Sequence, residues 1–360
     1  MNWRRSIGWF GAVLAVVAFI GAGAAGAAHA APAPRSAANV AAFGIPHEAS
    51  KVILPDTSFD GPALWTQRGP SAPVGPAGVL AWTGTDGRLN FEFTNDGVQF
   101  FGKKTVNEYS AVHPAVVRGT GEGGFDAPVA LAWMGTDSGH RLNVLYAVTG
   151  SPTLKLTLWQ DNTFTSPALE WLDNKTLLLV WAGTDRGHAL NILPITVSSQ
   201  ALTPGAKIIL WNYHSAAQPA IINDGSVLPT EPRMFLSWTD MTSQRITFAT
   251  SPDSKTWTLQ PAFAEWSGAG PSMMGLNERL DFMPPYWLGW TGLDSAHHVN
   301  VLYALDFNHW TTSNVKATLP ELATGGTAIG FVLSPPDQQM LVAWTGTDAA
   351  HHLNVARIAV

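Results

Sequence analysis

One phrase recurs six times along this chain of 360 residues, and its spacing constrains the fold more than any other feature. Each copy places a bulky aliphatic residue two positions before a tryptophan and, in most copies, a Gly-Thr-Asp turn soon after it. The tryptophans stand about fifty residues apart, at Trp82, Trp133, Trp181, Trp238, Trp290 and Trp344. A period of this length is typical of a supersecondary unit that stacks on copies of itself.

Each unit carries four short β-strand signals and almost no helix signal. Large and small residues alternate before the tryptophan, and a second alternating stretch such as residues 142–146 follows the turn, so the two form a hairpin. A Pro-Ala segment such as residues 114–117 precedes the hairpin, and a further strand such as residues 315–319 follows it. The pattern predicts an all-β fold, a six-bladed β-propeller with four-stranded blades. A pair of β-sandwiches fits the near-constant period poorly.

The two chain ends predict how the ring closes. The last copy stops near Ile358, after its third strand, whereas residues 51–54 resemble the fourth strand of other copies, such as residues 316–319. We therefore expect the propeller to span residues 51–360, with the N-terminal strand completing the last blade. An open array would need capping repeats with polar outer faces, and none is evident.

The first fifty residues carry targeting and linker signals. Arg4 and Arg5, an apolar run and the small residues 28–30 predict a signal peptide over residues 1–30, by the general or the twin-arginine route. Its apolar core is too short for a convincing membrane span. The Ala/Pro-rich residues 31–50 predict a mobile linker. We expect an exported protein, secreted, periplasmic or held at the cell surface.

The composition limits the classes of partner that the protein can bind. The net charge is −6 and there is no basic tract, so nucleic acid and anionic membrane surfaces are poor candidates. There is no cysteine, so the core must hold without disulfides. We expect a monomer that needs no cofactor.

Two repeated residues favour structural roles. A large aromatic at one strand position in every copy predicts packing between blades, and sugar stacking is the less favoured alternative for this set. The asparagine in the third strand alternates with apolar neighbours, which indicates a buried side chain tied to backbone rather than a ligand contact. It occurs at Asn90, Asn143, Asn191, Asn300 and Asn354.

Four copies follow the turn aspartate with a histidine three residues later. These pairs are Asp137 and His140, Asp185 and His188, Asp294 and His297, and Asp348 and His351. A structural turn is favoured, because glycine accepts positive φ and Thr or Asp side chains bond to nearby amides. A metal site is disfavoured, because each blade supplies one pair and closed sites want four ligands. The remaining alternative is a repeated ligand-binding turn.

Three copies carry an aspartate four residues before an aromatic, in residues 94–100, 251–257 and 305–310. This resembles the Asp-box of sialidase-like (BNR-repeat) propellers. The resemblance implies a six-bladed propeller in which the Asp-box turns face away from the active site. The Gly-Thr-Asp turns then lie on the ligand-facing rim.

The resemblance does not extend to the sialidase catalytic set, which needs three arginines to clamp a carboxylate, a Tyr–Glu nucleophile pair and an Asp acid. Arg118 and Arg233 are the arginines that could face a central pocket, and Glu170 and Tyr109 are central-pocket candidates beside them. Further polar candidates near inner-strand ends are Glu108, His113, Asp224, Glu278 and Tyr286. A general glycosidase needs only two suitably placed carboxylates.

These patterns favour an exported binding module for glycans or another extracellular ligand, with weak sites repeated around the rim and made useful by multivalency. The alternative is an exo-glycosidase, a sialidase-like hydrolase with a central-pocket active site. A third possibility is a purely structural or protein-interaction role.

Overall fold

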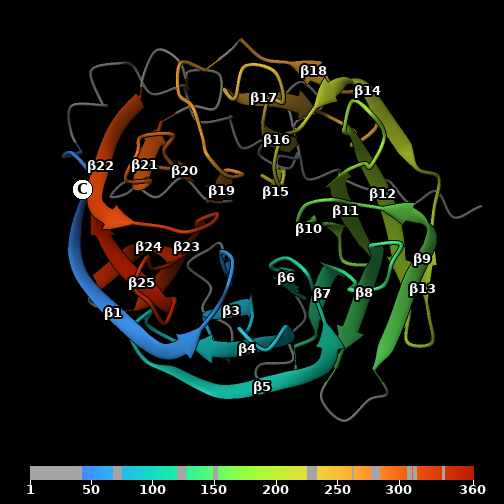
Figure 1. Cartoon of the computed structure of the whole chain (residues 1–360), viewed down its shortest axis with the longest axis horizontal. Coiled ribbons are helices and arrows are strands. Elements are labelled where there is room, and N and C mark those ends of the chain that lie inside the picture. Colours follow the sequence, from blue (N-terminus) through green and yellow to red (C-terminus); the bar gives the residue numbers. More distant parts are fainter. Residues whose placement is uncertain are drawn as a thin grey trace, which may run out of the picture. The chain divides into compact units, whose positions relative to one another are not determined.

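Figure 1 shows the computed structural model of the chain as a ring of small sheets. The structure describes residues 43–67, 75–119, 127–148, 153–224, 233–261, 263–276, 284–305, 310, 314–334 and 337–360. All of them belong to one unit, Arg35–Val360. The predicted signal peptide, residues 31–42 of the predicted linker, Glu278 and Asp306 lie outside the described residues. Within the described ranges, no helix is long and apolar enough to cross a membrane.

Six antiparallel sheets form the blades, which confirms the predicted six-bladed propeller. Blade 1 comprises β2 (Ala63–Thr66), β3 (Gly78–Thr83), β4 (Arg88–Thr94) and β5 (Phe100–Tyr109). Blade 2 comprises β6 (Ala115–Arg118), β7 (Val129–Met134), β8 (Arg141–Ala147) and β9 (Leu154–Asn162). Blade 3 comprises β10 (Ala168–Asp173), β11 (Thr176–Ala182), β12 (Ala189–Val197) and an outer strand in two pieces, β13 (Leu202–Pro204) and β14 (Ile208–His214).

Blade 4 comprises β15 (Ala220–Asn223), β16 (Met234–Thr239), β17 (Ile246–Ser251) and the short β18 (Thr258–Leu259). Blade 5 comprises β19 (Ser272–Gly275), β20 (Tyr286–Thr291), β21 (His298–Ala304) and β22 (Asn314–Leu322). Blade 6 comprises β23 (Ala328–Ser334), β24 (Asp337–Thr345), β25 (His352–Ala359) and β1 (His47–Thr57). The first strand of each blade contacts the first strand of the next, and β23 contacts β2, so the ring is closed (Figure 1).

The closing strand comes from the N-terminal end of the described chain, as predicted. β1 pairs antiparallel with β25, where Lys51 lies opposite Ala356 and Val52 opposite Val355. The strand begins at His47, inside the stretch assigned to a linker, because pairing with β25 continues that far. The preceding residues also pack on the ring, since the Tyr303 hydroxyl donates to the carbonyl of Gly44 at 3.1 Å.

Six hydrophobic clusters fill the seams between neighbouring blades. Each contains one repeat tryptophan, which packs against the preceding blade. Trp82 thus lies with Leu341 of blade 6, and Trp133 with Val79 of blade 1. The repeat tryptophans are 0–1% exposed, which confirms their role in packing between blades.

Two turns between third and fourth strands have the geometry expected of the Asp-box-like segments. Oδ1 of Asp96 accepts hydrogen bonds from the amides of Val98 and Gln99 at 2.9 and 2.8 Å. Asp253 binds the amides of Lys255 and Thr256 in the same way. These turns lie at the opposite strand ends from the Gly-Thr-Asp turns, so the two kinds of turn occupy opposite faces of the propeller.

Candidate functional site: the rim turns and the central channel

The turn between the second and third strands of a blade is built around its aspartate. In blade 2, Oδ1 of Asp137 accepts a hydrogen bond from the amide of Gly139 at 2.9 Å. The amide of His140 donates to the Asp137 carbonyl at 2.9 Å, and His140 has a left-handed backbone with φ of 48°. The side chain and the carbonyl of the aspartate therefore fix the turn together.

The same geometry recurs in the other predicted pairs. Asp185, Asp294 and Asp348 each cap an amide two residues on, and His188, His297 and His351 have φ between 52° and 59°. The aspartate and histidine of each pair lie in the same turn, but the four turns belong to four different blades. They therefore do not converge on one site.

The two copies without a histidine fold in the same way. Gly87 in blade 1 and Gln244 in blade 4 hold the left-handed position, with φ of 79° and 56°. Asp240 of blade 4 accepts bonds from the amides of Thr242 and Ser243 at 3.1 and 2.8 Å. A copy that is blurred in sequence thus keeps the turn.

The glycine of the Gly-Thr-Asp turn is required for close packing and not, as expected, for a positive φ. None of these glycines has a positive φ in the described part of the chain. A Cβ on Gly135 would lie 2.8 Å from Oδ2 of Asp137 and 3.0 Å from Nδ2 of Asn143, so close approach excludes a side chain. Asn143 is buried, and its Nδ2 donates a hydrogen bond to the Arg141 carbonyl at 3.0 Å, as predicted for a side chain tied to backbone.

An arginine or histidine follows the left-handed residue in five of the six blades, a pattern that the sequence analysis did not single out. These residues are Arg88, Arg141, Arg245, His298 and His352, and Ala189 takes the place in blade 3. Three of them contact the turn aspartate directly. The separations are 3.2 Å from Arg141 Nη1 to Asp137, 2.7 Å from His298 Nδ1 to Asp294 and 2.8 Å from His352 Nδ1 to Asp348.

These contacts affect the aspartates electrostatically. Desolvation alone would raise the pKa of Asp294, but hydrogen bonds from the His298 ring and from backbone amides outweigh it and lower the pKa below its ordinary value. The same balance lowers the pKa of Asp348 beside His352. Both turns therefore carry an ionised carboxylate at neutral pH.

Exposed aromatic rings lie against the rim arginines. The guanidinium of Arg141 is 4.7 Å from the ring centroid of Trp159, and that of Arg245 is 5.0 Å from Trp266. Arg88 lies 5.7 Å from the Tyr109 ring, and its Nε donates to the Tyr109 hydroxyl at 3.2 Å. We call each set of exposed aromatic, arginine and turn aspartate a rim cluster.

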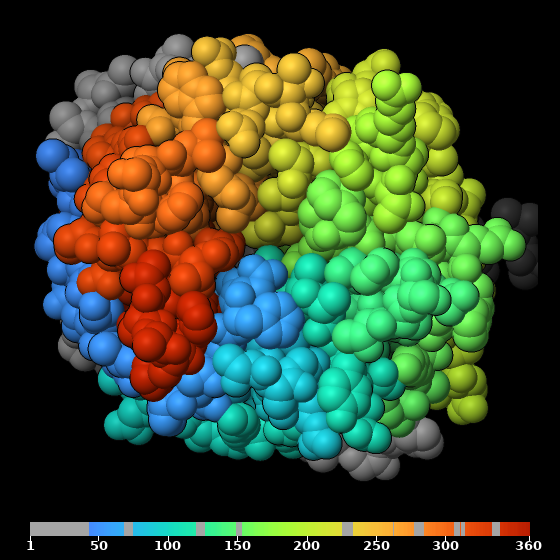
Figure 2. All heavy atoms as spheres, viewed as in Figure 1, coloured from blue at the N-terminus to red at the C-terminus, as the bar shows by residue number. Residues whose placement is uncertain are grey.

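The central channel holds a small cavity of about 80 Å³. Its walls are the first strands of all six blades, and most lining residues are aliphatic or methionine. Glu170 on β10 is the one charged residue among those lining it, and its Oε1 accepts a hydrogen bond from the Trp171 amide at 2.9 Å. Figure 2 shows the blades as successive blocks of colour around a central depression.

The other central-pocket candidates lie elsewhere. Arg118 ends β6, and its Nη1 donates to the carbonyl of Pro76 in blade 1 at 2.7 Å. Arg233 donates to the carbonyl of Leu172 in blade 3. Both arginines join neighbouring blades at the strand ends away from the Gly-Thr-Asp turns. Tyr109 stands on the outer strand of blade 1, in a rim cluster.

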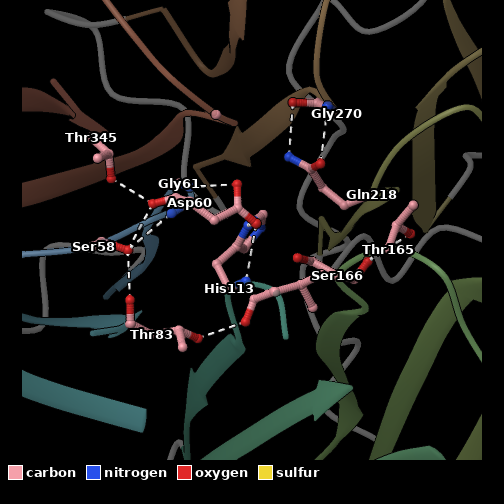
Figure 3. A network of polar contacts seen from close by, with 12 residues as sticks. Ser58, Asp60, Gly61, Thr83, His113, Thr165, Ser166, Gln218, Gly270 and Thr345 are labelled. Carbon is pink, nitrogen blue, oxygen red and sulfur yellow. Dashed lines mark hydrogen bonds and ion pairs between the residues drawn. The ribbon is translucent and has the colours of Figure 1, made fainter. Parts of the chain in front are cut away.

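The mouth of the channel on the Gly-Thr-Asp face is bound by polar contacts (Figure 3). Oδ2 of Asp60 lies 2.9 Å from Nδ1 of His113 and accepts a bond from its amide at 3.1 Å. Gln218 exchanges two hydrogen bonds with the backbone of Gly270, at 3.0 and 3.1 Å. These contacts cross from one blade to the next, so they brace the mouth.

The Asp60 carboxyl is the strongly perturbed group of this mouth. Its partial burial would raise its pKa, but the His113 ring and two backbone amides dominate and lower the pKa to about 2. Sequence analysis missed Asp60 and Gln218. The available signal was their position immediately before the Pro-led first strands, where each connection turns toward the axis.

The described residues contain no group of three or more His, Cys, Asp or Glu side chains that could hold a metal ion.

The fold matches that of solved propellers. A protein of unknown function from Dyadobacter fermentans superposes with a TM-score of 0.60 at 12% identity, over 88% of this chain and 99% of that chain. A mutant of the Aleuria aurantia lectin in complex with Fucα1-6GlcNAc superposes with a TM-score of 0.54 at 9% identity, over 86% and 97%. At these identities the likeness shows the fold alone.

The sialidase from Trypanosoma rangeli, in complex with sialic acid, gives a TM-score of 0.48 at 9% identity, over 88% of this chain and 57% of that chain. A superposition this loose supports no argument about the site. No protein-family model and no curated protein matches the sequence.

Proposed function

We propose that this chain is an exported glycan-binding propeller whose binding sites are the rim clusters of individual blades. The observation that carries the proposal is the cluster in blade 2. Trp159 is 71% exposed, Arg141 lies 4.7 Å from its ring centroid, and Asp137 holds Arg141 at 3.2 Å. An open aromatic beside an ordered guanidinium and carboxylate matches the two surfaces of a sugar ring.

The chemistry of each part supports this role. An aromatic face packs against the C–H face of a pyranose and keeps its polar edge in water. Arginine offers donors and aspartate offers acceptors, which together satisfy sugar hydroxyls. Because Asp137 also caps its own turn, the arginine is positioned before a ligand arrives, and less conformational entropy is lost on binding.

Repetition supports the proposal as well. Blades 1 and 4 have an arginine at the position of Arg141, and each arginine lies beside an exposed ring, Arg88 beside Tyr109 and Arg245 beside Trp266. Several weak sites on one rigid ring would gain avidity on a surface that displays many copies of one sugar. The signal peptide predicted for residues 1–30 would bring these sites to glycans outside the cytoplasm.

The central channel supports a glycosidase less well. Hydrolysis by either common route uses two carboxyl groups flanking the scissile bond. Among the residues lining the cavity, Glu170 is the one carboxylate, and the volume of about 80 Å³ is far below that of ordinary ligand pockets. A lectin shares this fold, so the scaffold is compatible with glycan sites.

A glycan array probed with the mature protein, run beside a panel of fluorogenic glycosides, tests the proposal. We expect binding to a defined set of glycans that is lost in the double variant Trp159→Ala, Trp266→Ala, and no glycoside cleavage. The double variant His298→Ala, His352→Ala is the matched control on the same face. Cleavage that depends on Glu170, or the absence of any glycan binding, contradicts the proposal.

A further inference from the structure

We propose that the ligand is an extended neutral oligosaccharide or polysaccharide chain that lies along four consecutive blades, rather than separate sugars in six equivalent sites. This inference rests on the proposed function. The surface that carries it is an arc of four exposed rings, Tyr109, Trp159, Trp211 and Trp266, which we call the aromatic arc. They belong to blades 1, 2, 3 and 4 in order.

The arc follows the last part of the fourth strand, beside the first residues of the third strand, and so lies toward the Gly-Thr-Asp face. Trp159 and Trp211 lie three residues before the ends of their strands, whereas Tyr109 ends its strand and Trp266 lies at the corresponding paired position. Tyr109 lies opposite Arg88 in the ladder, and Trp266 forms a bridge with Arg245. The four rings are 44%, 71%, 64% and 43% exposed in blade order.

Blades 5 and 6 differ at this place. The residues before their last paired positions are Pro320 and Glu321 in blade 5, and Pro55 and Asp56 in blade 6. Their turns carry His298 and His352, each held by its own aspartate. The four rings of the aromatic arc therefore cover one side of the ring of blades, and the rim is not six-fold symmetric. Phe59, 41% exposed, follows the last strand of blade 6 and lies next to the blade 1 end of the arc.

Two tryptophans of the arc, Trp159 and Trp211, lie in bulges of their strands. In blade 2 the ladder passes from Leu158 to Asn162, which leaves Trp159 in an unpaired stretch. In blade 3 it passes from Leu210 to His214 around Trp211. Such bulges bend a strand and redirect a side chain. Each holds a large apolar ring in water, which is costly unless the ring has a partner.

The seam between blades 2 and 3 adds a further ring to the arc. Phe164, 36% exposed, lies with its centroid 3.9 Å from the ring of His188. Aromatic platforms at successive positions along a surface are suited to successive units of a chain. A ligand made of repeating sugars could stack on several of them at once.

Charge indicates a neutral chain. Each arginine of the arc shares its turn with an aspartate, as Arg141 does with Asp137 and Arg88 with Asp86. The turn in blade 3 pairs Asp185 with the adjacent Arg186 in sequence. Each of these turns holds one aspartate for its arginine, so the turns of the arc have no excess of positive charge to attract uronate or sulfate groups.

Calorimetric titration with oligosaccharides of two to six units tests this inference. The probes are neutral cello-, xylo-, manno- and malto-oligosaccharides, with hyaluronan oligosaccharides as the anionic arm. We expect affinity for one neutral series to rise at least about tenfold from two to six units, with one long chain bound per protein. The variants Trp159→Ala and Trp211→Ala should each remove most of this gain, whereas His352→Ala should leave it unchanged.

The outcomes separate the two claims. If sugars bind but affinity does not depend on chain length, or several short ligands bind per protein, the rim sites stand and the extended chain is wrong. If only hyaluronan binds, with a steep dependence on salt, the neutral chain is wrong. If no probe and no array glycan binds, the proposed function itself fails. Thermal unfolding of each variant shows whether the fold is retained.

Discussion

The ammonium of Lys155 lies 5.5 Å from the ring centroid of Trp133 and 2.5 Å from Oε1 of Glu108, on the outer strand of the preceding blade. Acid, lysine and tryptophan form the same ladder at three more seams. These are Asp56, Lys103 and Trp82; Asp161, Lys207 and Trp181; and Glu265, Lys316 and Trp290. Lys51 and Glu321 pair at the seam of blades 5 and 6.

The remaining seam, between blades 3 and 4, is bridged by an aromatic pair instead. Blade 4 has no lysine at this place, and Tyr213 of blade 3 stacks on Trp238 with centroids 5.1 Å apart and planes 19° apart. An aromatic thus takes the place of the acid and the lysine together. Each seam of the ring is bridged near its outer edge.

The ladder should contribute measurably to stability. Lys155→Met keeps the aliphatic stem but removes both the ion pair and the cation–π contact, so we expect the free energy of unfolding to fall by about 1 kcal/mol. Urea denaturation measures the change. Lys104→Met is the control, because Lys104 is an exposed lysine of the outer strand β5, and it should change the free energy of unfolding little. Equal effects from both variants would contradict a specific role for Lys155.

The buried and exposed tryptophans should behave oppositely. Trp133→Ala empties a seam and should lower the free energy of unfolding by about 3–5 kcal/mol. Trp159→Ala alters an exposed ring and should change it by no more than about 0.5 kcal/mol. Chemical denaturation of the two variants makes the comparison. A large loss in Trp159→Ala would show that this ring supports the fold rather than a ligand.

Glu92 makes stability depend on pH at the seam where the ring closes. Burial, and then the charge of Asp56, raises its pKa from 4.5 to about 7, although Lys103 opposes the shift. The folded pKa lies above the unfolded value, so the folded state is favoured below about pH 4.5. This advantage is lost as pH rises from about 4.5 to about 7, by up to about 3 kcal/mol.

The control for this prediction is Glu92→Gln, which should flatten the stability profile over that window. Asp60 acts with the opposite sign, because its pKa is lowered to about 2, so its contribution disappears only as pH falls below 3.8. The two groups therefore titrate in separate windows. Identical profiles for Glu92→Gln and the unaltered protein between pH 4.5 and 7 would contradict the assignment to Glu92.

The histidine of the rim turn can be tested apart from the aspartate. His140 has φ of 48°, which favours glycine, so His140→Gly should raise the free energy of unfolding by about 0.5–1 kcal/mol. If His140 is only a turn residue, glycan binding should be unchanged. Thermal unfolding and titration of this one variant measure both effects. Loss of glycan binding would show that His140 contacts the ligand.

The repeat made the fold predictable, because the tryptophan period and the alternation around it reflect backbone geometry shared by all blades. Closure by an N-terminal strand was predictable too, since Lys51 and Leu54 copy other fourth strands, but residues 47–50 of that strand were assigned to the linker. The glycine of the turn was misread. Sequence gave no sign that Asp137 and Asn143 both approach Gly135 from the side where a Cβ would lie.

The candidate site was harder to predict, because its parts come from different strands. Asp137 belongs to the repeated phrase, but Trp159 lies in a bulge outside that phrase, and its contact with Arg141 follows from the register of β8 and β9. Asp60 and His113 meet across two blades. No spacing along the chain encodes either meeting.

The central claim is that the rim cluster of Trp159, Arg141 and Asp137 binds sugar. Its most direct test is calorimetric titration of Arg141→Ala and Trp159→Ala with the tightest-binding array glycan, each beside the His352→Ala control. The account predicts that both variants stay folded and lose at least about tenfold in affinity while the control binds as the unaltered protein does. Unchanged affinity in folded Arg141→Ala and Trp159→Ala would contradict it.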